Sequence, residues 1–181
     1  MGGPLMRRSP VGGVLAVATL ALVGCGGTER PPDVVLVSID TLRADALSCY
    51  GNSGATSPRL DALAADGLRF DNAYVTSPNT APSHATLFTG LGPWTHRVGN
   101  ISSPEYGTMS LADEFTTLAE HFTEAGYLTA AVTDGDPLGP GWNLLQGFEV
   151  QVPVYDDVAT SVDTVLELLD DSARERPLFL F

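Results

Sequence analysis

The chain has 181 residues, a formal net charge of −13 and no lysine. This length suffices for one domain with a hydrophobic core, at the usual size of about 100 to 200 residues per domain. An acidic surface repels nucleic acid and anionic lipid, so no nucleic-acid partner is expected. Most of the acidic residues are expected to be solvated surface groups.

An export leader is predicted at the N-terminus. Arg7 and Arg8 precede an apolar run over 11–23, which is shorter than the roughly 20 residues that a membrane-spanning helix needs. The run ends in Leu22-Val23-Gly24-Cys25, which resembles the bacterial lipobox, whose cysteine is lipidated and becomes the first residue after cleavage. An ordinary secretory peptide with an incidental cysteine is the alternative.

The lipobox resemblance implies a lipoprotein signal peptide over 1–24, a lipid anchor on Cys25 and a short tether over 25–32. The protein is then expected to be exported and anchored to a bacterial membrane, facing the periplasm or the cell exterior. Because the lipid uses Cys25, Cys49 has no disulfide partner in the chain and is predicted to be a small buried packing residue.

The first predicted strand covers 34–39 and leads to the carboxylate of Asp40. Its continuous apolar run contains several β-branched residues. This pattern is typical of a parallel strand that is buried on both faces.

A helix is predicted next, with Ser57 as its N-cap, Pro58 at its first position and Gly67 past its last turn. A short strand over 68–73 is expected to follow. The apolar face of the helix would carry Leu60, Leu63 and Ala64.

A threonine hydroxyl lies at the start of the next predicted helix, which begins at Ala81 or Ser83 and ends at Thr89. Pro82 is tolerated there because it falls in the first turn. A helix N-terminus stabilises anions, so Thr80 is a candidate for a metal-assisted nucleophile acting on a phosphate or sulfate ester. The alternative for an isolated threonine is a helix N-cap.

The second half of the chain continues the alternation of helices and strands. Thr117 and Glu120 match a capping box, and Gly126 ends that helix. A strand follows over 128–132, and a glycine-rich loop over 137–148.

A further helix is expected to be capped by Asp156 or Asp157. A last apolar strand over 177–181 stops without a turn or a polar cap, so the domain over 33–181 is expected to be truncated at its C-terminus. This strand would offer an unpaired apolar edge and make the chain prone to aggregation. The buried face of the preceding helix would carry Val158, Val162, Val165, Leu166 and Leu169.

Taken in order, these segments resemble the sulfatase family of the alkaline-phosphatase-like superfamily. The resemblance implies a three-layer α/β/α fold with a mostly parallel sheet, of which 33–181 would be the N-terminal part. The match covers nearly the whole chain after the leader, through 33–45, 49–51, 57–70, 72–74 and 80–90.

In that family the aspartate that ends the first strand binds the catalytic metal, a role that falls here on Asp40. The segment equivalent to 80–90 begins with a Cys or Ser that is oxidised to formylglycine, the group that attacks sulfur. The resemblance therefore implies a hydrolase or transferase with a divalent metal (Ca, Zn or Mn) bound by Asp40 and Thr80. Its substrate would be a small molecule, glycan or lipid that carries a sulfate or phosphate ester.

Departures from the family pattern change the expected chemistry. Thr80 is not converted to formylglycine and would act as an ordinary alkoxide, as in the phosphatase and phosphoethanolamine-transferase relatives, which favours phosphate esters. Thr41 stands where sulfatases carry a second aspartate, and His84 where they carry an arginine. The chain has no lysine to bind the anion, so arginine or later sequence would have to do so.

Several charged residues near these motifs have alternative roles. His84 could position Thr80 or contact the ester oxygen, or be a polar surface residue. Arg43 and Asp45 could lie around the metal, or form a local cap and ion pair. Loop or surface positions are expected for His96, for which the pocket rim is the alternative, and for His121, Asp134 and Asp136.

Three functional classes follow from these patterns. The leading one is a membrane-tethered ester hydrolase or transferase with Thr80 and His84 as catalytic residues and a metal on Asp40. The second is a catalytically degenerate binding lipoprotein, suggested by the absence of the second aspartate and of lysine. The third is an inactive fragment, because its core would be incomplete.

Overall fold

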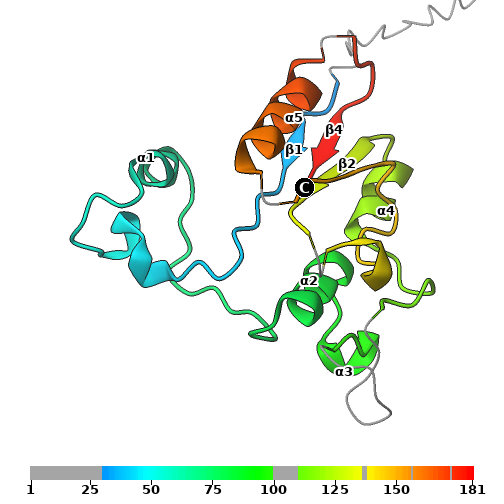
Figure 1. Cartoon of the computed structure of the whole chain (residues 1–181), viewed down its shortest axis with the longest axis horizontal. Coiled ribbons are helices and arrows are strands. Elements are labelled where there is room, and N and C mark those ends of the chain that lie inside the picture. Colours follow the sequence, from blue (N-terminus) through cyan, green and yellow to red (C-terminus); the bar gives the residue numbers. More distant parts are fainter. Residues whose placement is uncertain (1–29, 100–109, 136–137, 156, 172) are drawn as a thin grey trace, which may run out of the picture.

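The computed structural model describes residues 30–99, 110–135, 138–155, 157–171 and 173–181. The predicted signal peptide over 1–24 and the predicted lipidation site Cys25 lie outside this part of the chain. Figure 1 shows a sheet with helices on both faces, and a lobe around α1 that stands apart from the sheet. Within the described ranges, no helix is both long and apolar enough to cross a membrane.

Over the described residues the sheet has four strands, and every pairing between them is parallel. Their spatial order is β1-β4-β2-β3, so the strand that comes last in the sequence lies in the interior of the sheet. The strands are β1 (Val34–Val35), β2 (Leu128–Thr133), β3 (Val150–Pro153) and β4 (Leu178–Leu180).

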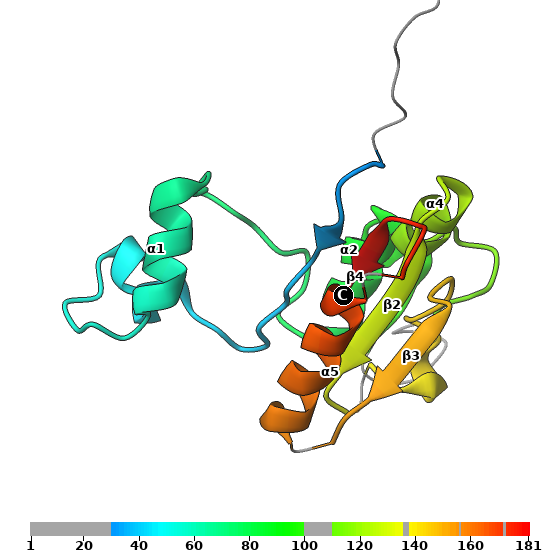
Figure 2. The same ribbon diagram turned by 90° about the horizontal axis from the view of Figure 1, so that it is seen from above.

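The helices lie on both sides of this sheet, with α2 and α4 against one face and α5 against the other (Figure 2). The α-helices are α1 (Pro58–Asp66), α2 (Thr80–Thr89), α3 (Pro93–His96), α4 (Leu118–Glu124) and α5 (Val158–Asp170). The 3-10 helices are η1 (Ala44–Ala46), η2 (Ser48–Tyr50) and η3 (Pro140–Trp142).

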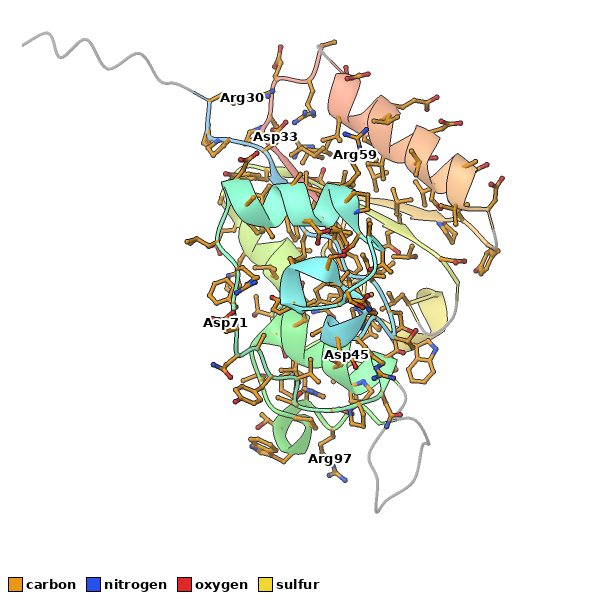
Figure 3. All side chains as sticks on the ribbon, turned by 90° about the vertical axis from the view of Figure 1, so that its left-hand side faces the viewer. Arg30, Asp33, Asp45, Arg59, Asp71 and Arg97 are labelled. Atoms are coloured by element: carbon orange, nitrogen blue, oxygen red, sulfur yellow. The ribbon has the colours of Figure 1, made fainter. Side chains whose placement is uncertain are left out.

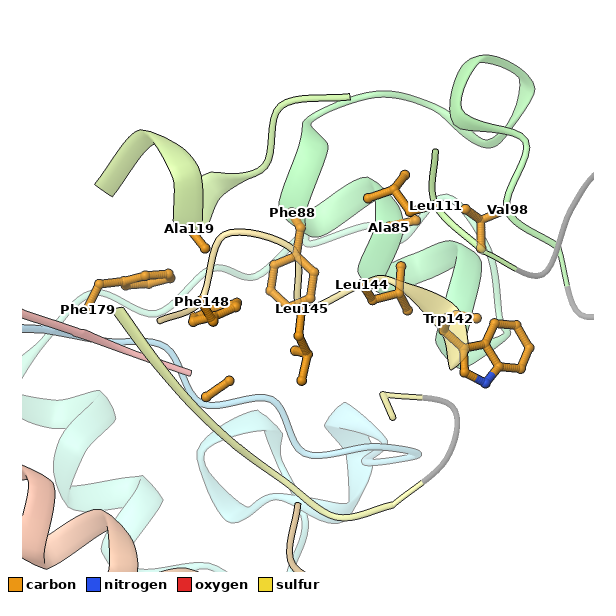
Figure 4. Close-up of a cluster of buried hydrophobic side chains, with 12 residues drawn as sticks. Ala85, Phe88, Val98, Leu111, Ala119, Trp142, Leu144, Leu145, Phe148 and Phe179 are labelled. Atoms are coloured by element: carbon orange, nitrogen blue, oxygen red, sulfur yellow. The ribbon is translucent and has the colours of Figure 1, made fainter. Parts of the chain in front are cut away.

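Side chains of β4 divide the core between the two faces, because successive residues of a strand point to opposite sides. Phe179 stacks on Phe122 of α4 with ring centroids 4.1 Å apart, and it lies in the cluster drawn in Figure 4. Leu178 and Leu180 lie in a second cluster, against which Val165 of α5 packs. The predicted three-layer α/β/α fold is therefore confirmed.

The predicted loop over 137–148 is irregular apart from η3, as far as it is described, but it also completes the core (Figure 4). Gly147 has φ +88°, and a Cβ there would lie 2.5 Å from Glu120 Cγ, so only glycine lets the loop approach α4 this closely. The strand β3 follows this loop and was not expected from the sequence. The loop's buried apolar side chains are Trp142, Leu144, Leu145 and Phe148.

The capping box of α4 is confirmed. Thr117 Oγ1 accepts from the Glu120 N–H at 3.2 Å, and the Glu120 carboxylate accepts from the Thr117 N–H at 2.7 Å. Gly126 follows the helix with φ +87°. Both ends of α4 are thus determined by residues close in sequence.

The first strand is shorter than predicted. Of the predicted strand 34–39, the part that pairs with β4 is Val34–Val35. The Leu36 N–H then donates one more hydrogen bond to Leu180 O at 2.8 Å. Farther along, Val37 and Ile39 are 74% and 51% exposed, so the prediction of a strand buried on both faces is wrong. The reason is that β1 lies at the sheet edge and its extension leaves the sheet towards α1.

The α1 lobe follows its predicted boundaries only in part. Helix α1 begins at Pro58 as predicted, but Ser57 makes no side-chain capping bond and donates instead to Asp61 at 3.0 Å. Its apolar side chain Leu63 is 69% exposed. The predicted strand over 68–73 is absent, since the segment is irregular throughout.

Helix α5 forms as predicted, with Asp157 Oδ1 accepting from the N–H groups of Ala159 and Thr160. Val165 packs on the sheet as predicted, but its partner there is Leu168, which was not part of the predicted face. Four of the five predicted core residues are exposed instead, namely Val158, Val162, Leu166 and Leu169.

The predicted unpaired edge at the end of the chain is also wrong. The strand itself forms over Leu178–Leu180, but β1 pairs with one of its sides and β2 with the other. The edges of the sheet are β1 and β3. The expected aggregation through β4 therefore loses its physical basis.

Candidate active site

The extension of β1 carries Asp40 to a tight turn. The Leu42 N–H points to Ile39 O at 3.4 Å, and Thr41 has φ +58°. A β-branched residue rarely adopts this left-handed conformation, because its side chain crowds the backbone. Backbone strain of this kind is therefore stored directly beside the predicted metal ligand.

Helix α2 brings Thr80 to the same place. Asn79 is the N-cap residue, with an extended backbone and no side-chain capping bond, and Thr80 is the first helical residue. The alternative of Thr80 as the N-cap is therefore wrong. The free N–H groups and the dipole of this ten-residue helix favour an anion next to Thr80.

The two predicted site residues meet. Thr80 Oγ1 donates a 3.3 Å hydrogen bond to Asp40 Oδ1, at a position open to solvent. An alcohol next to a carboxylate at a helix N-terminus is an arrangement that can act as a nucleophile towards an anionic ester.

His84 lies one turn after Thr80 and is only 7% exposed, so it is not the polar surface residue that was one alternative. Its Nδ1 lies 2.9 Å from the carbonyl oxygen of Thr80. Its Nε2 lies 3.0 Å from Ser38 Oγ.

Ser38 was not singled out from the sequence. One signal could have identified it, since residues two apart in an extended chain point to the same side, and Ser38 lies two positions before Asp40. Its partner His84 is 46 residues away, and no local pattern predicts that contact.

The prediction for His96 is wrong. It ends α3, is 2% exposed, and its Nε2 lies 3.1 Å from Thr86 Oγ1. Its Nδ1 accepts from the Val98 N–H at 3.0 Å, and burial lowers the pKa of its imidazole. These contacts give His96 a structural role between α2 and α3.

Arg43 and Asp45 form an exposed ion pair with one another, 2.5 Å between Nη2 and Oδ2, and this hydrogen bonding lowers the pKa of the Asp45 carboxyl. The alternative of a local pair is thus the one observed. Cys49 is half-buried, and desolvation raises the pKa of its thiol, which is typical of an unreactive cysteine.

The other predicted surface residues agree where they are described. His121 and Asp134 are exposed. Asp136 lies outside the described residues.

The donor chemistry of Asp40 and Thr80 fits a hard divalent cation, which prefers oxygen ligands. Over the described ranges, no group of three or more His, Cys, Asp and Glu side chains could hold a metal ion. A metal bound there would have two of its roughly six donors from Asp40 and Thr80.

Comparison with known proteins assigns the chain to a family. The family model described as Sulfatase matches residues 32–139. N-acetylgalactosamine-6-O-sulfatase of Bacteroides thetaiotaomicron is 35% identical over 107 residues, which are 59% of this chain and 21% of that protein. Human arylsulfatase A is 40% identical over 112 residues, 61% of this chain and 22% of that protein. The chain thus spans about a fifth of the length of these relatives.

Solved structures agree with the sequence comparison. A 2-O GAG sulfatase superposes with a TM-score of 0.65 and 28% identity, covering 84% of this chain and 34% of that one. A phosphonate monoester hydrolase of Agrobacterium radiobacter gives a TM-score of 0.54 and 25% identity, covering 79% of this chain and 30% of that one. Because the family model spans more than half of its residues, the chain belongs to the sulfatase family.

Proposed function

We propose that this protein is a metal-dependent hydrolase or transferase of phosphate or sulfate esters, with Thr80 as the nucleophile. The observation that carries the proposal is the 3.3 Å hydrogen bond from Thr80 Oγ1 to Asp40 Oδ1 at the N-terminus of α2. Similarity to sulfatases and to a phosphonate monoester hydrolase supports the proposed action on esters.

In the proposed reaction, Thr80 Oγ1 forms a bond to phosphorus or sulfur while the bond to the leaving alcohol breaks. The leaving oxygen takes the electron pair and is protonated by water. Asp40 Oδ1, which accepts the hydrogen bond of the Thr80 hydroxyl, would take the proton that Thr80 gives up. Water or a second alcohol then releases the group from Thr80, which completes hydrolysis or transfer.

Asp40 and Thr80 are the residues that would hold the metal, a divalent ion such as Ca, Zn or Mn. When bound, such an ion supplies the positive charge that makes an alcohol acidic enough to react near neutral pH. The N–H groups of the first turn of α2 would bind the non-bridging oxygens of the ester.

A threonine nucleophile favours phosphorus over sulfur. By resemblance, sulfatases release sulfate through collapse of the hydrated aldehyde of formylglycine, and a threonine ester has no second hydroxyl for this step. We therefore expect phosphate mono- or diesters to be better substrates than aryl sulfates. As an exported, lipid-anchored protein, it would act on glycans, lipids or small molecules outside the cytoplasm.

The purified protein should be assayed with p-nitrophenyl phosphate, p-nitrophenyl phenylphosphonate and p-nitrophenyl sulfate, with the divalent metal varied. We expect Thr80→Ala and Asp40→Ala each to lower the rate at least about 100-fold. Thr80→Ser should retain activity because it keeps the hydroxyl.

A matched control exists at the start of α5, where Thr160 Oγ1 also donates to an aspartate, Asp157 Oδ2, at 2.5 Å. Thr160→Ala should leave the rate unchanged. Faster turnover of the sulfate than of the phosphorus esters, or full activity in Thr80→Ala, would refute the proposed chemistry. Metal binding without turnover of any ester would favour a catalytically degenerate binding protein instead.

A further inference from the structure

His84 uses both of its ring nitrogens. The carbonyl oxygen of Thr80 can only accept a hydrogen bond, so Nδ1 at 2.9 Å carries the proton and donates it. In the neutral ring Nε2 then has a lone pair, and the Ser38 hydroxyl donates to it across 3.0 Å. Neither nitrogen is left for direct contact with an ester.

Packing restricts the His84 ring as well. Its centroid lies 6.1 Å from that of Phe88 and 5.9 Å from that of Phe181. With the side chain almost fully buried between these rings, rotation would break both hydrogen bonds and open a gap in the core. The imidazole is therefore held in one orientation, in which it connects Thr80 O to Ser38 Oγ.

Two hydrogen bonds connect the same two segments of the chain. The first runs from Thr80 to Asp40, and the second, between His84 and Ser38, lies one helical turn along α2 and two residues back along the extension of β1. The core holds α2 through Ala81, Ala85 and Phe88. The two hydrogen bonds add a direct connection between the first turn of the helix and the extension of β1.

We infer that Ser38 and His84 form a positioning pair, which holds the first turn of α2 against the extension of β1 and so keeps Thr80 Oγ1 at Asp40. The inference rests on the proposed function of Thr80 and Asp40, and it assigns the pair no contact with substrate. Preorganisation of this kind matters because a misplacement of about 1 Å can cost up to about 100-fold in rate.

The test compares Ser38→Ala, Ser38→Thr and His84→Phe with wild type. Ser38 is exposed, so Ser38→Ala removes the hydroxyl without opening a cavity, and Ser38→Thr restores a hydroxyl. If His84→Phe fails to fold, Ser38→Ala still decides the question.

The chain offers a matched control in the other hydroxyl–imidazole pair on α2. Thr86 Oγ1 lies 3.1 Å from His96 Nε2, and Thr86 is about 200° around the helix from His84. Thr86→Val breaks this bond, and also the one that Thr86 Oγ1 accepts from Thr76 Oγ1 at 2.9 Å, but it should leave the orientation of Thr80 unchanged.

The first readout does not depend on activity. In wild type, ring nitrogen NMR shifts should identify the Nδ1–H tautomer of His84, and nuclear Overhauser contacts should connect the Thr80 methyl to the Asp40 methylene protons. Ser38→Ala should shift the His84 Nε2 resonance and weaken the Thr80–Asp40 contacts. Ser38→Thr and Thr86→Val should preserve both signals.

The second readout is the split between kcat and KM with the best ester. Ser38→Ala should lower kcat about 10- to 100-fold with little change in KM, while Ser38→Thr and Thr86→Val retain kcat. If the Thr80–Asp40 contacts persist in Ser38→Ala, the inference is overturned whether or not the protein is active. If wild type shows the contacts and Ser38→Ala loses them but no ester is turned over, the positioning pair stands and the proposed function fails.

Discussion

Arg174 and Asp33 form a bidentate ion pair between the start of β1 and the loop that leads to β4, with N–O distances of 3.0 and 2.8 Å. Asp33 Oδ1 also accepts from the Leu178 N–H at 2.8 Å, and Arg30 lies beside it (Figure 3). The Arg174 side chain is only 5% exposed. The pair thus connects the first and last strands of the described sheet.

This ion pair should make the protein sensitive to acid. The Arg174 guanidinium lowers the pKa of Asp33 from 3.8 to about 2, so the stabilisation is fully present above pH 4 and is lost as the pH falls from about 4 to about 2. The loss should be about 1 to 2 kcal/mol of unfolding free energy. Denaturant melts of wild type and Asp33→Asn across this range measure it, and the variant should show a flatter pH dependence.

The control for that measurement is Asp71→Asn. Asp71 pairs with Arg69 at 2.8 Å, but the two side chains are 72% and 41% exposed, so this pair should contribute little. An equal change of pH dependence in Asp71→Asn and Asp33→Asn would contradict the assignment to Asp33.

Phe179 should be one of the most sensitive core positions. It is 1% exposed and stacks on both Phe122 and Phe148. Phe179→Ala should lower the free energy of unfolding by about 3 to 5 kcal/mol, measured by urea denaturation. The control Phe70→Ala, at a side chain that is 68% exposed, should lower the free energy of unfolding by less than about 0.5 kcal/mol. Equal losses in the two variants would show that Phe179 is not a core residue.

The turn after Asp40 should gain stability from a residue that accepts a positive φ. Thr41 is exposed and has φ +58°, and asparagine tolerates this conformation better than threonine. Thr41→Asn should stabilise the protein by about 1 kcal/mol, while Thr95→Asn, at an exposed helical position, should not. A destabilised Thr41→Asn variant would show that the turn carries no strain.

The same position should control metal affinity. Thr41→Asp adds a second carboxylate next to Asp40 in a conformation that aspartate also tolerates, so divalent-metal binding should tighten at least about 10-fold. Titration calorimetry with Mn²⁺ or Zn²⁺ measures the change. Thr41→Asn separates the effect of charge from that of strain, and equal tightening in both variants would rule out a new carboxylate ligand.

Mass spectrometry of the mature protein tests the predicted anchor. We expect an N-terminal acylated Cys25, loss of residues 1–24, and an unmodified Cys49 as the internal control. A Cys25 still joined to Gly24 would exclude lipoprotein processing.

The sequence predicted those elements whose determinants lie close together in the chain. Helix α4 is determined by the Thr117 capping box. Helix α2 ends at Thr89 as predicted, before Gly90 with φ +69°, but it begins at Thr80 and not at the predicted Ala81 or Ser83. Asp40 and Thr80 were singled out through the order of motifs, and the fold brings their side chains within hydrogen-bonding distance. Their roles as nucleophile and metal ligand stay predictions.

The wrong predictions concern residues whose environment is decided by contacts with segments distant in sequence. The apolar pattern of α5 is compatible with several faces, and only contact with the sheet selects Val165 and Leu168. Strand β3 contains Gln151 and Pro153, which weaken the local strand signal; Pro153 is tolerated at its end because β3 is an edge strand. The Ser38–His84 contact requires two distant segments and leaves no signature in either.

The central place of β4 constrains how the chain can fold during synthesis. Asp33 and Leu178, which are hydrogen-bonded, lie 145 residues apart in sequence, so a nascent chain that emerges N-terminus first cannot complete the described sheet until β4 has left the ribosome. Until then β1 has no partner among the other described strands, and Asp40 has no fixed position relative to Thr80. If the predicted leader directs export of the unfolded chain, Thr80 and Asp40 would come together only after the chain has crossed the membrane.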